Sequence, residues 1–267
     1  MSGGRSPALR IARAQMRDVI RGRWFLAYLG FVILLTDGLS RFGGDPSRAM
    51  LSLMDVMLLV VPLVTIVFAT MYFYQAREFV ELLLSQPVRR RAVFSGLYLG
   101  LMVPLAGVWT LGVGIPLLIH GTAGGSERVT LGALILVGVA LTLVFGALGL
   151  LVAVRTEDRL RGLGVALGVW LLTAVVYDGL VLLLVSTLAN YPLERPMLGL
   201  MLANPVDLGR VLLLLRFDIS ALLGYTGAVF QQFFGGVRGA GIGAAALLLW
   251  ICLPLMLAAR SFTRKDF

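Results

Sequence analysis

The sequence predicts an all-α integral membrane protein with six transmembrane helices. Hydrophobic residues make up 59% of the 267 residues and charged residues only 14%, whereas a soluble domain carries about 25% charged residues. The mean hydropathy is +0.93. Six apolar segments approach or exceed the roughly 20 residues that a helix needs to cross a bilayer. Residues 1–267 are therefore expected to form a single transmembrane domain.

The composition excludes several function classes. The net charge of +9 comes almost entirely from arginines spread over the loops between apolar segments, so no nucleic-acid partner is expected. The single cysteine, Cys252, lies inside an apolar segment and allows no disulfide within the chain. The single histidine, His120, rules out a bis-histidine haem or a histidine-rich metal site in one chain.

The N-terminal stretch predicts a basic amphipathic helix over residues 9–23. Arginines recur on one face at Arg10, Arg13, Arg17 and Arg21, and apolar residues recur on another. A helix with this pattern lies in the bilayer interface, with its arginines among lipid phosphates. A signal peptide is the alternative, but residues 36–38 offer no small-residue cleavage site. We therefore expect an uncleaved elbow helix that leads into the first span.

Six segments are predicted to span the membrane because each is apolar and nearly free of charge. They cover approximately Trp24–Ser40, Leu51–Tyr74, Ala92–His120, Val129–Val154, Leu163–Ala189 and Gly239–Ala259. Glycine recurs within them, and the fourth span contains Gly132, Gly138, Gly146 and Gly149. Small residues let membrane helices approach closely, so these glycines are expected to serve packing.

The basic residues predict that both termini are cytoplasmic. With that orientation 16 of the 23 basic residues fall on the cytoplasmic side, as the positive-inside rule requires. The sixteen are Arg5, Arg10, Arg13, Arg17, Arg21, Arg23, Arg77, Arg89, Arg90, Arg91, Arg155, Arg159, Arg161, Arg260, Arg264 and Lys265. Residues 76–91 and 155–161 then form the two cytoplasmic loops.

The first cytoplasmic loop, residues 76–91, is the segment around which the sequence is organised. The residue pattern in the middle of this loop predicts a short amphipathic helix that ends at Pro87. One side of the helix is rich in leucine, and Glu78 and Glu81 lie together on one flank. Two interpretations are open: a solvated loop that only sets orientation, or a coupling helix that receives a push from a soluble partner. The candidate coupling residues are Arg77, Glu78, Glu81, Leu82, Leu83, Arg89 and Arg90.

The third outer loop, residues 190–238, is long and is expected to be structured. The run Asn204-Pro205-Val206-Asp207 is typical of a helix start, with Asn as N-cap and Pro at the first helical position. The apolar run that follows is too short to span, and a second short helix is expected over residues 228–234. Both are predicted to be re-entrant or interfacial, with their non-helical backbone buried in protein.

Three acids fall within or at the ends of spans. Asp37 and Asp55 lie near outer ends, where we expect solvation or capping. Asp178 follows Tyr177 about halfway along the fifth span, where an acid is costly unless it is paired or wet. Because no basic residue lies in a span core, a salt bridge within the subunit is not expected. We predict a hydrogen bond to a neighbouring helix, and a wet cavity at a dimer axis is the alternative.

Ten methionines raise the question of a copper site, because thioether sulfur suits Cu(I). Met50, Met54 and Met57 lie on one helix face, and Met197 and Met201 open the third outer loop. Methionines at helical spacing are more often packing residues than ligands. No metal site is therefore expected in the chain.

Motifs for catalysis and for nucleotide binding are missing from the sequence. A P-loop needs a lysine, and Lys265 is the only one. Neither HExxH nor GxSxG occurs. Catalytic residues and cofactors are therefore not expected in this chain.

Several stretches resemble the ABC-2 type transporter permeases. Residues 81–90, ELLLSQPVRR, resemble the first cytoplasmic loop of that family, although the Gly-Thr that usually precedes the leucines is missing. Residues 12–25 resemble the family's elbow helix. Tyr177-Asp178 and the stretch from Asn204 to Arg210 resemble the NosY subfamily, which serves in copper-site maturation of nitrous oxide reductase.

The resemblance implies a homodimer of six-helix subunits in the bacterial inner membrane, in contact with membrane lipids. Each subunit would rest on one copy of an ABC ATPase that holds the ATP and Mg²⁺. A periplasmic protein of the NosD type would be a further partner, with Asn204, Pro205, Asp207 and Arg210 as its candidate contacts. The alternatives are a generic ABC-2 exporter of lipid, drug or polysaccharide, and, from another class, a membrane-embedded enzyme or redox anchor.

Overall fold

The computed structural model describes residues 7–43, 46–120, 125–187, 194–217 and 237–264. All regular structure in these ranges is helical, as the sequence predicts. The elements are α1 (Pro7–Arg21), α2 (Arg23–Phe42), α3 (Pro46–Gln75), α4 (Arg77–Leu84), α5 (Arg90–Ile119), α6 (Gly125–Arg155), α7 (Arg159–Leu171), the π-helical turn η1 (Leu172–Val176), α8 (Tyr177–Thr187), α9 (Glu194–Leu202), α10 (Pro205–Leu214) and α12 (Val237–Arg264).

The six predicted spans are confirmed by length and composition. They are α2, α3, α5, α6, the continuous helix α7–η1–α8, and α12. A seventh apolar unit, the pair α9 and α10, is bent by 110° at the short break between its helices, as a broken span or re-entrant segment would be. The second short helix predicted over residues 228–234 lies outside the described residues.

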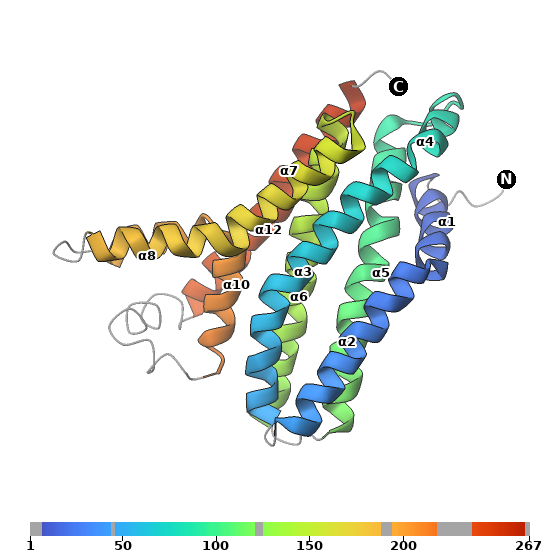
Figure 1. Ribbon diagram of the computed structural model, residues 1–267. Coiled ribbons are helices and arrows are strands. Elements are labelled where there is room, and N and C mark those ends of the chain that lie inside the picture. Colours follow the sequence, from blue (N-terminus) through green and yellow to red (C-terminus); the bar gives the residue numbers. More distant parts are fainter. Residues whose placement is uncertain (1–6, 44–45, 121–124, 188–193, 218–236, 265–267) are drawn as a thin grey trace.

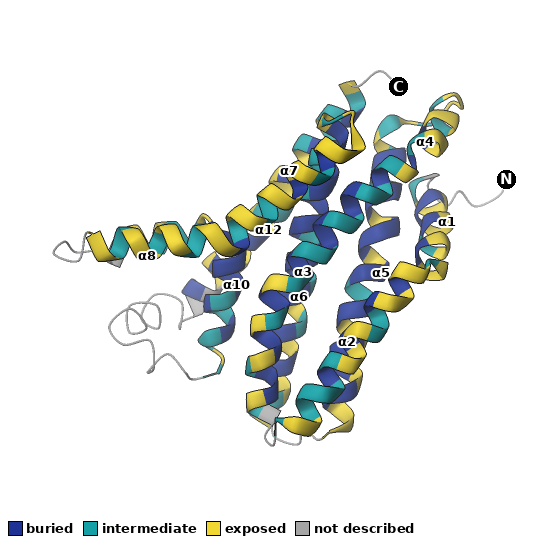
Figure 2. Ribbon diagram, in the orientation of Figure 1, coloured by how far each residue is buried: buried dark blue, intermediate teal, exposed yellow. Residues whose placement is uncertain are grey.

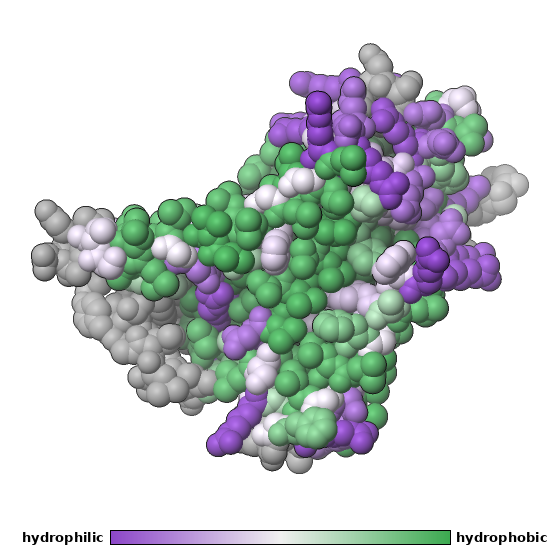
Figure 3. Space-filling model, viewed as in Figure 1, coloured by the Kyte–Doolittle hydropathy of each residue, from purple (hydrophilic) through white to green (hydrophobic). Residues whose placement is uncertain are grey.

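The spans form a bundle whose centre is α3, α5 and α6 (Figure 1). α1, α4 and the last turns of α12 lie at one end of the bundle, and the last turns of α2 and α5 lie at the other, with the first turns of α3 and α6. Hydrophilic surface gathers at the first of these ends, and a broad hydrophobic surface covers the middle (Figure 3). This distribution is what a multi-pass membrane protein requires.

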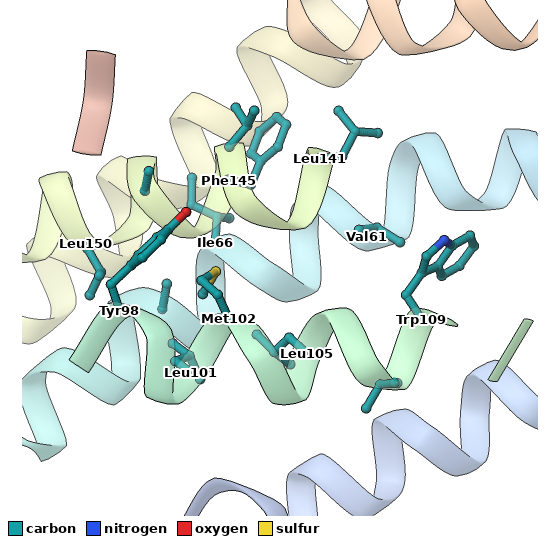
Figure 4. Close-up of a cluster of buried hydrophobic side chains, with 14 of the residues drawn as sticks. Val61, Ile66, Tyr98, Leu101, Met102, Leu105, Trp109, Leu141, Phe145 and Leu150 are labelled. Atoms are coloured by element: carbon teal, nitrogen blue, oxygen red, sulfur yellow. The ribbon is translucent and has the colours of Figure 1, made fainter. Parts of the chain in front are cut away.

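The core is built from the facing sides of α3, α5 and α6 (Figure 4). Two large residues of α5 reach it with polar tips that are satisfied by the backbone of α6. The Tyr98 hydroxyl donates to the Leu143 carbonyl at 3.0 Å, and the Trp109 indole N–H donates to the Leu134 carbonyl at 3.4 Å. These bonds remove the cost of burying the two groups in an apolar interior.

Glycines in α6 allow this close packing at three of the four predicted positions. A Cβ added to Gly149 would lie 2.8 Å from the Ile66 carbonyl oxygen of α3. Gly138 and Gly146 face α5 side chains even more closely. The prediction was wrong for Gly132, where an added Cβ would meet nothing within 4 Å.

The methionine stripe at the start of α3 belongs to the core. Met50, Met54 and Met57 are each buried, and all three pack in the main hydrophobic cluster. The prediction that they are packing residues is therefore confirmed. Their flexible thioether side chains fill space among branched neighbours.

The N-terminal helix α1 packs against α5. Cβ atoms added at Gly96 and Gly100 would lie 2.8 Å and 2.6 Å from the Cβ atoms of Ile11 and Gln15. Only glycine permits this approach of the two backbones. The Gln15 side chain is buried and accepts a hydrogen bond from the Tyr72 hydroxyl of α3. The helix is thus fixed to the bundle as well as amphipathic.

Span five differs from the others because it bends and leaves the bundle. The bend coincides with η1, and α8 beyond it has no buried residue (Figures 1 and 2). A π-helical turn inserts one residue into an α-helix and is a recognised cause of a kink. The sequence gives little sign of this turn, since residues 172–176 contain no proline or glycine.

Candidate functional site

A cluster of polar groups joins the bend of span five to the α9–α10 hairpin. We call it the polar latch. It consists of Thr173, Tyr177, Asp178, Asn204, Asp207 and Arg210. Its members come from η1, from the first turn of α8 and from the start of α10.

The π-helical turn explains why the latch begins at Thr173. At the end of η1 the Tyr177 N–H donates to the carbonyl of Leu172, five residues back instead of four. This shift leaves a backbone carbonyl without a helical partner. The Asn204 side-chain amide donates to the Thr173 carbonyl at 2.8 Å. A residue of the α9–α10 hairpin thus satisfies the irregular backbone of the span.

Asn204 also starts α10, as the sequence predicts. Its backbone is extended, with φ −126° and ψ 121°, and its side-chain oxygen accepts from the Val206 N–H at 3.1 Å. Pro205 occupies the first turn, where its missing N–H costs nothing. The remaining amide hydrogen is donated to Asp207 at 3.1 Å. This one buried amide therefore caps α10, binds η1 and orients a carboxylate.

Arg210 places the charge at the centre of the latch. Its Nη1 atom donates to Asp178 Oδ2 at 2.7 Å and to Asp207 Oδ1 at 3.2 Å. The prediction that Asp178 makes no salt bridge within the subunit was wrong, because the partner comes from the α9–α10 hairpin and not from one of the six spans. The signal available in the sequence was Arg210 itself, a lone charge between Leu208 and the run of leucines that follows it.

Two further bonds hold the end of α9. The Tyr177 hydroxyl donates to the Leu200 carbonyl at 2.7 Å, and the Trp250 indole N–H of α12 donates to the Leu202 carbonyl at 3.1 Å. The last carbonyls of a helix have no partner inside it. The hairpin is thereby fixed from both sides, by span five and by span six.

The latch also corrects the prediction of outer partner contacts. Asn204, Pro205 and Asp207 are buried within the chain, so in this conformation their side chains offer no surface to a soluble partner. Arg210 is 34% exposed and is occupied by its two carboxylates. Among the hairpin residues whose burial the structure describes, the exposed positions are instead Pro196, Gly199 and Ala203.

At the opposite end of the bundle, α4 forms an exposed tip between α3 and α5. Val80 is fully buried and anchors the helix to the core. Leu82 is 68% exposed, and Phe79, one turn before it, is exposed as well. Hydrophobic surface at this tip lies among hydrophilic surface (Figure 3). Phe79 is not among the coupling residues predicted from the sequence.

The candidate coupling residues divide into two groups. Glu78, Glu81, Leu82 and Arg89 point outward, and Arg77 lies 3.7 Å from Glu81. Leu83 and Arg90 instead face the bundle. Leu83 packs on the core, and Arg90 donates to the Thr263 carbonyl of α12 at 3.2 Å. The helix ends at Leu84, three residues before the predicted terminator Pro87.

The loop between α6 and α7 is fixed to the end of α3. The Tyr74 hydroxyl lies 2.5 Å from the Thr156 hydroxyl, and it also reaches the Thr156 carbonyl at 3.2 Å. Asp158 caps α7 by accepting from the backbone N–H groups of Arg161 and Leu160. These hydrogen bonds hold the pKa of the Asp158 carboxyl below its usual range.

The last turns of α2 and α5, at the end of the bundle opposite α4, are joined by a third charged group. Asp37 lies 2.7 Å from His120 and 2.8 Å from Arg41. The carboxylate thus links the first and third spans, whereas Asp55 is exposed, as expected near an outer end.

The chemistry of these sites is charge pairing and hydrogen bonding. In the part of the chain that the structure describes, no three His, Cys, Asp or Glu residues gather where they could hold a metal ion. The carboxylates of the latch are bound by a guanidinium and an amide. Such an arrangement suits the holding and release of helices.

Comparison with known proteins identifies the family. Residues 50–267 match the family described as ABC-2 family transporter protein. The probable ABC transporter permease protein NosY of Stutzerimonas stutzeri is 28% identical over 96% of this chain and 97% of its own length. The protein of the same description from Pseudomonas aeruginosa is also 28% identical, over 96% of this chain and 97% of its own length. The chain therefore belongs to the ABC-2 transporter family, as a multi-pass permease subunit of an ABC transporter.

Proposed function

We propose that this permease couples ATP hydrolysis by a separate ABC ATPase to a periplasmic event, with α4 as the element that receives the force. The observation that carries this proposal is the tip of α4. Phe79 and Leu82 expose apolar surface next to the acidic Glu78 and Glu81, outside the spans. A small apolar patch with a charged rim is typical of a protein interface.

The anchoring of α4 favours transmission over a passive loop. Val80 ties the helix to the core, and its neighbours α3 and α5 are two of the three central helices. α3 is linked to the loop before span five by the Tyr74–Thr156 contact, and to span five itself by the Trp170 indole, which donates to the Leu59 carbonyl at 3.0 Å. The bend of span five carries the polar latch. A displacement of α4 would therefore reach the outer hairpin through packed helices and two hydrogen-bonded links.

The subunit is proposed to act as a homodimer. α8 has no buried residue in one chain, and the ion pair between Asp178 and Arg210 is one-third exposed at its edge. Charged groups within a membrane face protein or water rather than lipid. A second subunit would cover this edge. Each of the two subunits would bind its own ATPase.

Within this class we propose that the periplasmic event is copper-site maturation of nitrous oxide reductase in the bacterial inner membrane. Support comes from the similarity to two NosY permeases along nearly the whole chain. A NosD-type periplasmic protein is the expected outer partner. The exposed positions Pro196, Gly199 and Ala203 of the hairpin are available for such a contact.

Charge reversal at α4 tests the coupling step. Glu81→Arg removes the acid beside Leu82 and is expected to abolish co-purification of the ATPase, or its stimulated turnover, while the permease still folds. Glu157→Arg is the matched control, since it reverses an exposed acid in the other cytoplasmic loop. Normal ATPase binding and turnover in Glu81→Arg would show that α4 is only a connecting loop.

Deletion of the gene tests the copper step separately. Nitrous oxide reductase purified from the deleted strain is expected to lack copper, and the wild-type chain should restore it. If the reductase is fully loaded without the permease, the copper assignment fails, whereas the coupling proposal is decided by the ATPase measurements alone. The function that remains for a member of this family would then be that of a generic ABC-2 exporter.

A further inference from the structure

A cavity of about 270 Å³ lies at the ends of α6 and α12, on the same side of the bundle as α4. Its lining is strongly basic. It consists of Arg155, Leu257, Arg260, Ser261 and Arg264. Arg155 is in the last turn of α6, and Arg264 is in the last turn of α12. Three guanidinium groups, one hydroxyl and one leucine thus surround a single space.

The charges of this cavity are not balanced by acids of the described chain. None of its five lining residues is acidic, and none of the ion pairs found among the described residues involves its arginines. Guanidinium groups bind phosphate through paired N–H donors, and a serine hydroxyl adds another donor. The cavity therefore has the donor set for a phosphate group.

The surface of α12 indicates where that phosphate comes from. Leu249, Leu253 and Met256 are each about half exposed or more, and their spacing places them on the same helix face as Arg260. This exposed apolar stripe runs from the cavity along a membrane-spanning helix. A soluble anion would make no contact with this apolar stripe, whereas the acyl chains of a lipid would pack along it.

We propose that the cavity binds the phosphate headgroup of an anionic phospholipid, with the acyl chains lying along the Leu249–Leu253–Met256 stripe. The headgroup would bridge the last turns of α6 and α12. Basic pockets between spans at the cytoplasmic surface are suited to anionic headgroups. The bound lipid would sit one turn from Thr263, whose carbonyl accepts from Arg90 at the start of α5. It would thereby stabilise the contact between α12 and the first cytoplasmic loop.

The test measures lipid retention by the full-length protein in detergent. Native mass spectrometry would follow binding of a phosphatidylglycerol, with phosphatidylcholine as the zwitterionic comparison. The wild type should bind phosphatidylglycerol more tightly. The variant Arg155→Gln/Arg260→Gln/Arg264→Gln should lose affinity by roughly a hundredfold, since basic groups near a membrane surface each contribute appreciably. The matched control Arg89→Gln/Arg91→Gln/Arg161→Gln removes equal charge from exposed positions at the starts of α5 and α7, outside the cavity, and should retain binding.

A second variant keeps the proposal testable if the protein with the triple substitution fails to fold. Ser261→Glu keeps every arginine and places an anion inside the cavity, so it should also lose phosphatidylglycerol binding. Unchanged binding in Ser261→Glu and in the cavity triple variant would overturn the proposal. Equal loss in the control variant at the starts of α5 and α7, or equal affinity for phosphatidylcholine, would show general charge attraction and overturn it too. Displacement of the lipid by equimolar inorganic phosphate would mean that the site holds a soluble anion and that the apolar stripe contributes nothing.

Discussion

At Arg210, a single guanidinium nitrogen donates to two carboxylates, Asp178 on span five and Asp207 on its own helix. Loss of the cation therefore leaves two like charges close together. Loss of one acid leaves a complete pair behind. The two kinds of substitution should consequently differ in cost, although both break the same link between α8 and α10.

The first prediction is that Arg210→Gln destabilises the protein more than Asp178→Asn. Breaking a fully buried pair costs about 3–5 kcal/mol, and partial exposure of this pair reduces that range. We expect about 2–3 kcal/mol for Arg210→Gln and about 1 kcal/mol or less for Asp178→Asn. Thermal unfolding followed by tryptophan fluorescence provides the measurement, with exposed Asp55→Asn as control. A reversed order would mean that Asp178, and not Arg210, holds the latch together.

The second prediction concerns Asp158 and pH. Its folded pKa is lowered, so its capping contribution is present above the unfolded pKa of about 3.9 and is lost as the pH falls through the folded value. Asp158→Ala should lower the Tm by a few degrees at pH 7, and the difference from wild type should shrink below about pH 3.9. Asp158→Ser keeps a neutral cap, and its small difference from wild type should be greatest at pH 7 and shrink in the same acidic range. A constant difference for Asp158→Ala across this range would rule out the charged cap.

At the scale of elements, the π-helical turn and the α9–α10 hairpin depend on each other. In η1 the Tyr177 N–H donates to the Leu172 carbonyl, so the Thr173 carbonyl loses its usual α-helical donor, and the hairpin supplies one through Asn204. A hinge built in this way is stable only while the hairpin is docked. If the hairpin moves away, regular α-helix becomes the favoured conformation of span five, because its backbone hydrogen bonds are then all made within the helix.

The third prediction separates the capping role of Asn204 from the contacts that its amide group makes with Thr173 and Asp207. Asn204→Ser keeps a good N-cap for α10. Serine is too short to reach Thr173, however, and it lacks the amide group that donates to the Thr173 carbonyl. A buried unsatisfied carbonyl costs about 1–3 kcal/mol, so we expect a loss of that order and faster hydrogen exchange over residues 172–178. Thr187→Ser at the exposed end of α8 is the control. Wild-type exchange in Asn204→Ser would show that η1 needs no support from the hairpin.

Residues whose environment is set by nearby sequence were predicted well. The six spans follow from long apolar runs, and the cap at Asn204 follows from its own dipeptide with Pro205. The pairing of Asp178 with Arg210 could not be derived, because it joins positions 32 residues apart through a hairpin whose depth the sequence does not specify. η1 was missed for the same reason: it is stabilised by a distant amide, not by its own residues.

For the whole molecule, the membrane imposes one orientation on all of these sites. The ends of α1 and α12 lie together with α4, and the α5–α6 junction lies at the opposite end (Figure 1). More arginines lie near the end of the bundle that carries α4 than near the opposite end. Basic residues stay in the cytoplasm during membrane insertion. The α4 tip and the basic cavity should therefore face the cytoplasm, and the side of the Asp37–His120 pair should face the periplasm.

The last prediction is the accessibility pattern that this orientation requires. Single cysteines at Ser85, in the first cytoplasmic loop, and at Ser126, at the start of α6, are introduced into a Cys252→Ala background so that no native thiol remains. An impermeant maleimide added to intact cells should label Ser126→Cys and not Ser85→Cys, whereas inverted vesicles should give the opposite result. Cysteines at Ser2 and Ser261 should behave like Ser85→Cys, because six spans return the chain to its starting side. Labelling of Ser126→Cys only from the cytoplasm would invert the topology, and the ATPase could then not reach α4. Labelling of Ser2→Cys and Ser261→Cys from opposite sides would require an odd number of crossings, with the bent α9–α10 pair as a seventh span.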